Sequence, residues 1–174
     1  MGAEEELIRA LGEHGVRYVA IGVWGVNLYA KEITHLFLTR DQDLFLPPDP
    51  GNLLRAWQSA EAIGLELICG DEPLDRPRDH FVAEAVVARR ALTRATDGRD
   101  FLADFTLVMG DFDFETVWSE RRSFRLQGVE VPVARLSHIA QSKAAAGRPK
   151  DRLFLETHKE ILEGLIRRHE GNSP

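Results

Sequence analysis

The chain has 174 residues, of which 44% are hydrophobic and 29% are charged, a composition typical of one globular domain with a continuous core. Its 22 basic and 28 acidic side chains give a formal net charge of −6 and are spread along the sequence, which argues against extended nucleic acid as a partner. Cys69 is the single cysteine, which excludes an internal disulfide and fits a reducing, cytoplasmic compartment. No apolar run approaches the ~20 residues of a membrane span, and the first residues lack the pattern of a signal peptide. We therefore expect a cytoplasmic protein with no membrane partner.

The first part of the chain alternates helices with short strands. In chain order we expect a helix over 4–14, a strand over 17–22, a helix over 24–31, and extended pieces at 36–39 and 43–46 that form one bent strand or a hairpin. Asp49 and Pro50 are a favourable N-cap and first-turn pair for a helix that ends near Ile63. A strand over 65–69 and an exposed loop over 70–78 follow, whereas 81–91 fits a helix or a strand.

The second part contains two predicted hairpins and then helices. Strands over 91–96 and 101–108 flank the turn pair Asp97-Gly98, and a second hairpin over 124–133 turns at Gly128, after a short helix over 112–118. Ser137 is a candidate cap for a helix that reaches Gly147, Pro149 opens a long helix to about Arg168, and 169–174 is a polar, flexible tail. The order of elements predicts an α+β fold in a single domain over 1–168, with a core over about 1–110 and a C-terminal hairpin and helices over about 111–168.

Asp41 and Asp43 are the sharpest chemical feature. Residues i and i+2 of an extended segment project from the same face, so these two carboxylates can hold a divalent cation such as Mg²⁺, which prefers oxygen ligands. The alternative interpretation is a pair of solvated turn carboxylates in front of a strand.

A third carboxylate, Asp104, lies inside the apolar run 101–108. Burying it there is costly unless a cation or hydrogen bonds compensate its charge. Gly22 ends an apolar strand and opens a helix, so the turn offers backbone amides and a positive helix end to a phosphate. Together, these features are consistent with a phosphate and metal site, although Asp104 on the outward face of an edge strand remains an alternative.

Three sequence blocks resemble the nucleotidyltransferase superfamily, in particular its minimal nucleotidyltransferase and AbiEii toxin-like branch. They are the segments 18–29 (YVAIGVWGVNLY), 39–44 (TRDQDL) and 142–151 (SKAAAGRPKD). The resemblance implies a nucleotidyltransferase-like small mixed sheet flanked by helices. It also implies Mg²⁺ as cofactor, with two ions expected, and a nucleoside triphosphate such as ATP as substrate. Its nucleoside monophosphate would pass to a hydroxyl acceptor, which is a small molecule, a protein or an RNA end.

The same resemblance assigns candidate site residues. Catalysis and metal binding fall to three carboxylates, and nucleotide binding to the glycine turn with Trp24 and to the C-terminal helices: Asp41, Asp43 and Asp104, and Gly22, Val23, Trp24, Lys143 and Arg148. It is also compatible with a toxin of a toxin–antitoxin pair, whose partner would be a cognate antitoxin.

Two departures from the family pattern define the alternative. Val23 stands where the family prefers glycine or serine, so a branched side chain follows the turn. The link 31–39 is longer than the family's usual one. The alternative function is therefore a catalytically inactive member of this fold that acts as a binding or interaction protein.

Overall fold

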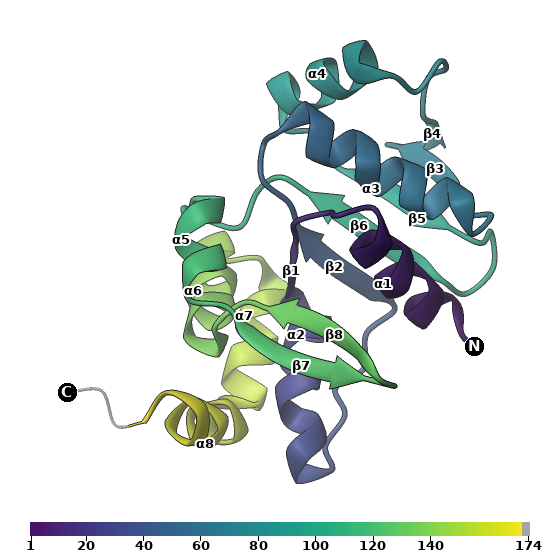
Figure 1. Ribbon diagram of the computed structural model, residues 1–174. Helices are drawn as coiled ribbons and strands as arrows, with labels where there is room; N and C mark the ends of the chain where they lie inside the picture. The colour runs from purple at the N-terminus through teal and green to yellow at the C-terminus, as the bar shows by residue number, and fades with distance from the viewer. Residues whose placement is uncertain (172–174) are drawn as a thin grey trace.

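A mixed sheet of eight strands organises the computed structural model, which describes residues 1–171 (Figure 1). In chain order the strands are β1 (Val19–Ile21), β2 (Asp41–Phe45), β3 (Glu66–Cys69), β4 (Glu72–Pro73), β5 (Thr93–Thr96), β6 (Leu102–Thr106), β7 (Arg122–Leu126) and β8 (Val129–Val133). Their spatial order is β4-β3-β5-β6-β2-β1-β8-β7. β2 is parallel to β6 and β1 to β8, and the other neighbouring pairs are antiparallel. A small mixed sheet with helices confirms the predicted α+β class.

Eight α-helices accompany the sheet within residues 1–171. They are α1 (Ala3–Glu13), α2 (Gly22–Ala30), α3 (Pro50–Ala62), α4 (His80–Arg89), α5 (Phe114–Ser119), α6 (Leu136–Ala146), α7 (Pro149–Thr157) and α8 (Lys159–Glu170), with a 3₁₀ turn, η1 (Lys31–Ile33), after α2. α3 packs between α1 and α4, whereas α6 contacts α2, α7 and α8. Figure 1 shows α5 to α8 gathered on the left of the view, apart from α1, α3 and α4.

Helix α3 forms where the sequence predicts it. The side chain of Asp49 accepts a hydrogen bond from the amide of Gly51, and Pro50 occupies the first turn, where its missing N–H costs nothing. Leu53 and Trp57 are fully buried, and the indole Nε1 donates to Thr93 Oγ1 at 3.0 Å. The buried N–H group of the Trp57 indole thus has a hydrogen-bond partner.

The segment 81–91 fits both a helix and a strand, and its residues 81–89 belong to helix α4. Asp79 accepts a hydrogen bond from the amide of Val82, which caps the helix, and Arg90 ends it in a left-handed conformation. The deciding signal is local capping, because the apolar pattern of this segment fits either structure.

The segment 36–39 is the first correction. It is not a strand: Phe37 is held by hydrogen bonds of its backbone N–H and C=O to the side chain of Asn27, and Leu38 is 95% exposed. Because the side-chain amide of Asn27 takes both backbone groups, no neighbouring strand is needed. Strand β2 instead begins at Asp41.

The C-terminal helices differ from the prediction in three ways. The predicted helix over 149–168 is two helices, α7 and α8, separated at His158, where the backbone leaves helical geometry. Ser137 does not cap α6, which begins at Leu136; its hydroxyl donates to Glu170. Residues 169 and 170, which the prediction assigns to the tail, belong to helix α8. The side chain of Glu170 is 3% exposed and pairs with Arg135. Of the predicted tail, 172–174 lie outside the described residues.

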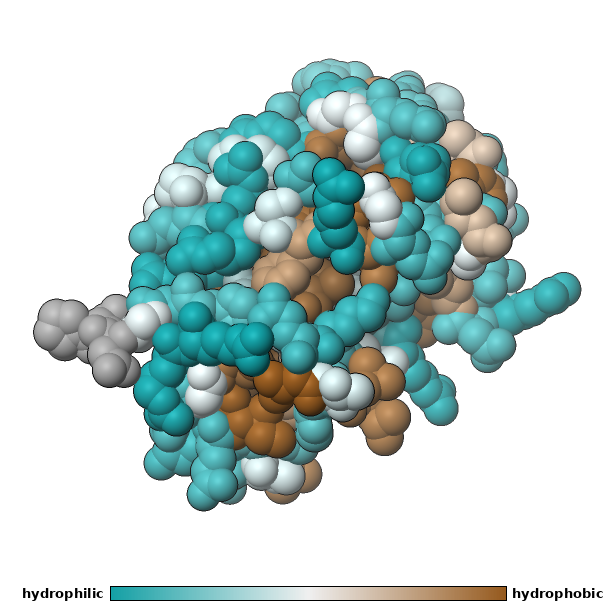
Figure 2. Space-filling model, turned by 60° about the horizontal axis from the view of Figure 1, so that its bottom comes forward, coloured by the Kyte–Doolittle hydropathy of each residue, from teal (hydrophilic) through white to brown (hydrophobic). Residues whose placement is uncertain are grey.

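Hydrophilic side chains cover most of the face seen in Figure 2, with apolar areas between them. The large apolar side chains with the greatest exposure are Leu38, Phe81, Met1, Leu36 and Leu153. Over residues 1–171, no helix has the length and apolar character that crossing a membrane requires.

Candidate functional site

A row of directly opposed residues crosses four neighbouring strands and sets the position of the site. Arg94 on β5 is opposite Asp104 on β6, Asp104 is opposite Asp43 on β2, and Asp43 is opposite Ile21 on β1. Residues opposite one another project from the same face of a sheet. Asp41 lies two residues before Asp43 and therefore shares this face. The structure thus brings the three predicted carboxylates to one face.

Gly22 follows Ile21 and lies against the carboxylate of Asp43. Its φ of +64° is in the left-handed region, and a Cβ placed on Gly22 would overlap Oδ2 of Asp43. Only glycine satisfies both conditions at once. The close contact between the turn at Gly22 and the carboxylate of Asp43 on β2 therefore requires glycine at this position.

The carboxylate of Asp43 is only partly compensated. Burial, together with the negative charges of Asp104 and Asp41, raises its pKa to about 6, against the opposing effect of Lys143 and Lys150. No donor within residues 1–171 forms a hydrogen bond that offsets this cost. A partly buried carboxylate in this condition is a fitting ligand for a cation.

Asp104 is compensated by a neighbouring side chain. Nε of Arg94 donates to Oδ1 of Asp104 at 2.6 Å and Nη2 donates to Oδ2 at 2.9 Å, a bidentate pair. Asp104 is only 6% exposed, and the ion pair with Arg94 compensates the cost of burying its charge in an apolar strand. Nη2 of Arg94 also lies 3.8 Å from Oδ2 of Asp41.

A cleft of about 380 Å³ opens between this sheet face and helix α6. One wall holds Gly22, Asp43 and Asp104, and the opposite wall is built by the loop after β6 and by basic and small side chains: Ser142, Lys143, Ala146 and Arg148. Gly110 allows this loop to approach closely, since a Cβ there would come within 3.3 Å of the backbone of Ser142. The cleft therefore has an acidic and a basic wall.

The basic wall is fixed by Asp151, which is fully buried at the start of α7. Arg148 donates to its carboxylate at 2.6 Å, and Nζ of Lys143 lies 3.5 Å from Oδ1. Burial opposes ionisation of Asp151, but the hydrogen bond from Arg148 and the charge of Lys143 outweigh it, so its pKa lies below the ordinary value. Burial also lowers the pKa of Lys143, against the attraction of Asp151 and Asp43. The side chain of Lys143 is 12% exposed and lines the cleft.

The other two predicted nucleotide-binding residues do not line the cleft. Val23 packs against the hydrophobic core, so its branched side chain does not fill the place where phosphate would approach. Trp24 is 4% exposed and its Nε1 donates to the carboxylate of Glu4 on α1. The structure therefore corrects the placement of Trp24, which belongs to the core contacts of α1 and not to the site.

The carboxylates present fit a magnesium ion that takes its remaining ligands from phosphate and water. Within residues 1–171, no three His, Cys, Asp or Glu side chains are placed so that they enclose a metal ion on their own. Mg²⁺ in nucleotide sites is typically bound by one or two carboxylates together with substrate phosphates, and Asp41 with the partly compensated Asp43 meets that requirement.

Arg94 is the residue that sequence reasoning missed. The predicted strands leave 97–100 between them and set no register, and the observed connection between β5 and β6 spans 97–101. The observed register places Arg94 opposite Asp104. The sequence does contain an arginine on the strand that is predicted to pair with the strand of Asp104. To predict that the two residues are opposite one another, the length of the connecting turn must also be known.

Comparison with known proteins places the fold. No protein-family model and no curated protein matches the chain. Its structure is similar to the solution structure of the antibiotic-resistance factor ANT(2'')-Ia, a nucleotidyltransferase, with a TM-score of 0.54 and 17% sequence identity over 96% of this chain and 89% of that one. The chain has a nucleotidyltransferase-like fold. This confirms the predicted fold, while the AbiEii-like branch stays a prediction.

Proposed function

We propose that the protein is a Mg²⁺-dependent nucleotidyltransferase that transfers a nucleoside monophosphate from a nucleoside triphosphate to a small-molecule hydroxyl. The observation that carries the proposal is one cleft in which Asp43 and Asp104, beside Gly22, oppose Lys143 and Arg148, with Asp41 on the same face of the sheet two residues from Asp43. Two acidic ligands for a cation facing two basic ligands for phosphate are the arrangement that a metal–triphosphate complex requires.

In the proposed reaction the acceptor hydroxyl gives up its proton to solvent and its oxygen attacks the α-phosphorus. The bond between the α-phosphorus and the oxygen that bridges it to the β-phosphorus breaks, and pyrophosphate leaves with that oxygen. Asp41 and Asp43 hold the cation, whose chemistry is to neutralise charge on the phosphates and to favour ionisation of the acceptor hydroxyl. Lys143 and Arg148 bind the phosphates of the leaving group from the opposite wall. The backbone amides at the start of α2, freed from side-chain obstruction at Gly22, orient the triphosphate. The protein contributes mainly position and charge.

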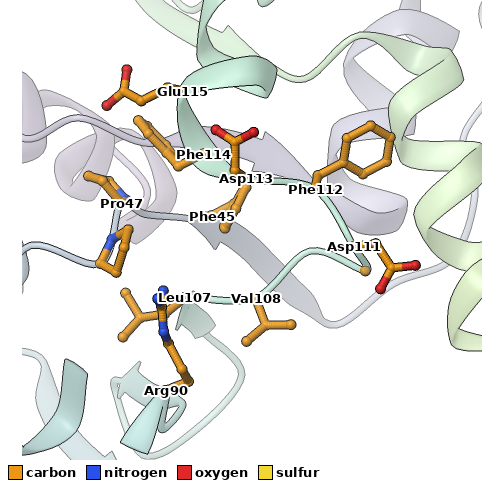
Figure 3. A pocket seen from close by; sticks show the side chains of 12 residues that line it. Phe45, Pro47, Arg90, Leu107, Val108, Asp111, Phe112, Asp113, Phe114 and Glu115 are labelled. Atoms are coloured by element: carbon orange, nitrogen blue, oxygen red, sulfur yellow. The ribbon is translucent and has the colours of Figure 1, made fainter. Parts of the chain in front are cut away.

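The acceptor site in this proposal is the cavity beside the cleft, shown in Figure 3. The two share Val108 and Gly110 and therefore adjoin. The cavity has about 420 Å³ and combines the rings of Phe112 and Phe114 with the carboxylate of Asp111. This volume and this mixture of apolar and polar lining suit a small organic molecule, which favours that acceptor class over a protein or an RNA end.

Calorimetric titration with each of the four common nucleoside triphosphates, with and without Mg²⁺, tests the proposal. We expect micromolar binding that depends on the metal and is lost in Asp43→Asn. Asp71→Asn, a change of an exposed aspartate in the loop between β3 and β4, is the matched control and keeps binding. Failure of all four nucleotides to bind would overturn the proposal and leave the interaction protein as the function of this fold. Where binding is found, transfer of a labelled α-phosphate to a panel of small alcohols, proteins and RNA identifies the acceptor class.

A further inference from the structure

The side chain of Arg94 reaches into the acidic row, and this bears on how many cations the site takes. Its guanidinium engages both oxygens of Asp104 and extends to within 3.8 Å of Asp41. It thus lies between two of the three carboxylates that the sequence predicts as ligands of a pair of metal ions.

The pairing is built into the sheet. Arg94 and Asp104 are opposite one another in the β5–β6 ladder, and both strands are interior to the sheet, so the backbone fixes their separation. The two hydrogen bonds to the nearly buried Asp104 use the planar donor pair of the guanidinium, and they raise the already high pKa of Arg94 further. The arginine is therefore a permanent positive charge at a fixed place.

A second divalent cation on Asp104 would have to share its oxygens with this guanidinium and would meet strong repulsion from it. Asp43, in contrast, has no hydrogen-bonded or ion-paired partner within residues 1–171, and the charges of Lys143 and Lys150 act on it only from a greater distance. Of the two carboxylates, Asp104 is thus neutralised by Arg94, whereas Asp43 has no such partner.

On this geometry, and resting on the proposed function, we propose that Arg94 takes the place of a second metal ion: the site binds one divalent cation, on Asp41 and Asp43, while the guanidinium neutralises Asp104. This departs from the two ions that the resemblance implies. Arg94 acts as a charge-compensating and positioning residue.

The number of cations bound per chain tests the inference without any measurement of activity. Mn²⁺, whose free form is counted by electron paramagnetic resonance, is titrated into the full chain in the absence of nucleotide and again with the nucleoside triphosphate that binds. We expect one Mn²⁺ per chain for the parent in both titrations and two for Arg94→Ala, in which Asp104 becomes available. Arg89→Ala removes the same charge from an exposed position on α4 and keeps one ion.

One further variant and a check of folding exclude trivial explanations of the Mn²⁺ counts. Arg94→Ala combined with Asp104→Asn removes the buried charge as well, and we expect it to return to one ion, which ties the second ion to Asp104. Circular dichroism of each variant confirms that it is folded. Two ions in the parent, or one ion in a folded Arg94→Ala, overturns the inference. A failure of every nucleotide to bind, with the Mn²⁺ counts as expected, contradicts the proposed function and leaves this inference standing.

Discussion

At the scale of single residues, the site depends on a fit between one glycine and one carboxylate. Gly22 has a positive φ and its Cα hydrogens face Oδ2 of Asp43. The conformation favours glycine for backbone reasons, and the contact demands it for steric reasons. Because Asp43 is also opposite Ile21 in the β1–β2 ladder, its backbone is held beside Gly22.

Replacing Gly22 tests this fit. We expect Gly22→Ala to destabilise the fold by about 1–3 kcal/mol, because the left-handed conformation is strained for alanine and the new Cβ displaces Asp43. Metal-dependent nucleotide binding should be lost as well. Urea unfolding measures the first effect and calorimetry the second. Gly98→Ala, at a positive φ with open space around it, is the control: it carries the same backbone strain but leaves binding intact.

The raised pKa of Asp43 predicts how stability depends on pH. An increase from the ordinary 3.8 to about 6 means that the folded chain holds the proton more tightly than the unfolded chain. The stability of the metal-free protein therefore falls as the pH rises from about 4 to about 6, by at most about 3 kcal/mol from this group. Asp43→Asn cannot ionise and should escape this loss, so its stability relative to the parent increases between pH 4 and pH 7. Urea unfolding of both proteins across this range, in the presence of a chelator, is the measurement. Stability curves that stay parallel would contradict the assignment.

At the scale of elements, the C-terminal helix is held to the domain by a cluster of polar side chains. Glu170, at the end of α8, accepts hydrogen bonds from Arg135 and from the hydroxyl of Ser137, at the start of α6. The ring of His169 packs edge-on against Tyr29 of α2. The last helix is thereby tied to two earlier ones.

Removing the carboxylate of Glu170 tests whether this cluster holds α8. We expect Glu170→Ala to lower the free energy of unfolding by about 2–3 kcal/mol, because it leaves Arg135 and Ser137 without their shared acceptor. Glu163→Ala changes an exposed glutamate on the same helix, and its effect should stay within about 0.5 kcal/mol. Denaturant unfolding compares the two. An equal, small effect of both substitutions would show that the cluster contributes little.

At the scale of the whole molecule, the cleft lies where the two parts of the chain meet. The acidic wall comes from the sheet of the first part and the basic wall from α6 and the residue that precedes α7. Since a cation at Asp43 relieves a charge that the fold alone only partly compensates, metal binding and stability are linked.

Magnesium should therefore stabilise the folded chain. At a free concentration one hundred times its dissociation constant, a ligand that binds only the folded state adds about 2.7 kcal/mol. For a chain of this size that raises Tm by about 5–11 °C. Thermal unfolding at pH 7 with Mg²⁺ or with a chelator measures the shift, and Asp43→Asn should show none. A shift of equal size in Asp43→Asn would place the metal elsewhere.

The sequence by itself determined the features that depend on local chemistry. The capping pair at Asp49 and Pro50 fixes α3, the hairpin turn at Gly128 fixes β7 and β8, and the i, i+2 spacing puts Asp41 and Asp43 on one face. These signals depend on residues a few positions apart, so they can be recognised in the sequence without knowledge of the tertiary structure.

Only the tertiary structure decided what faces what. The register that joins Arg94 to Asp104 follows from the length of a turn, and a shift of one residue would send the arginine to the other face of the sheet. The burial of Trp24 against Glu4 and the anchoring of Glu170 at Arg135 depend on contacts between residues far apart in the chain. Whether a charged or aromatic side chain serves the site or the core is set by such contacts, because local sequence specifies the direction of an element but not its neighbours.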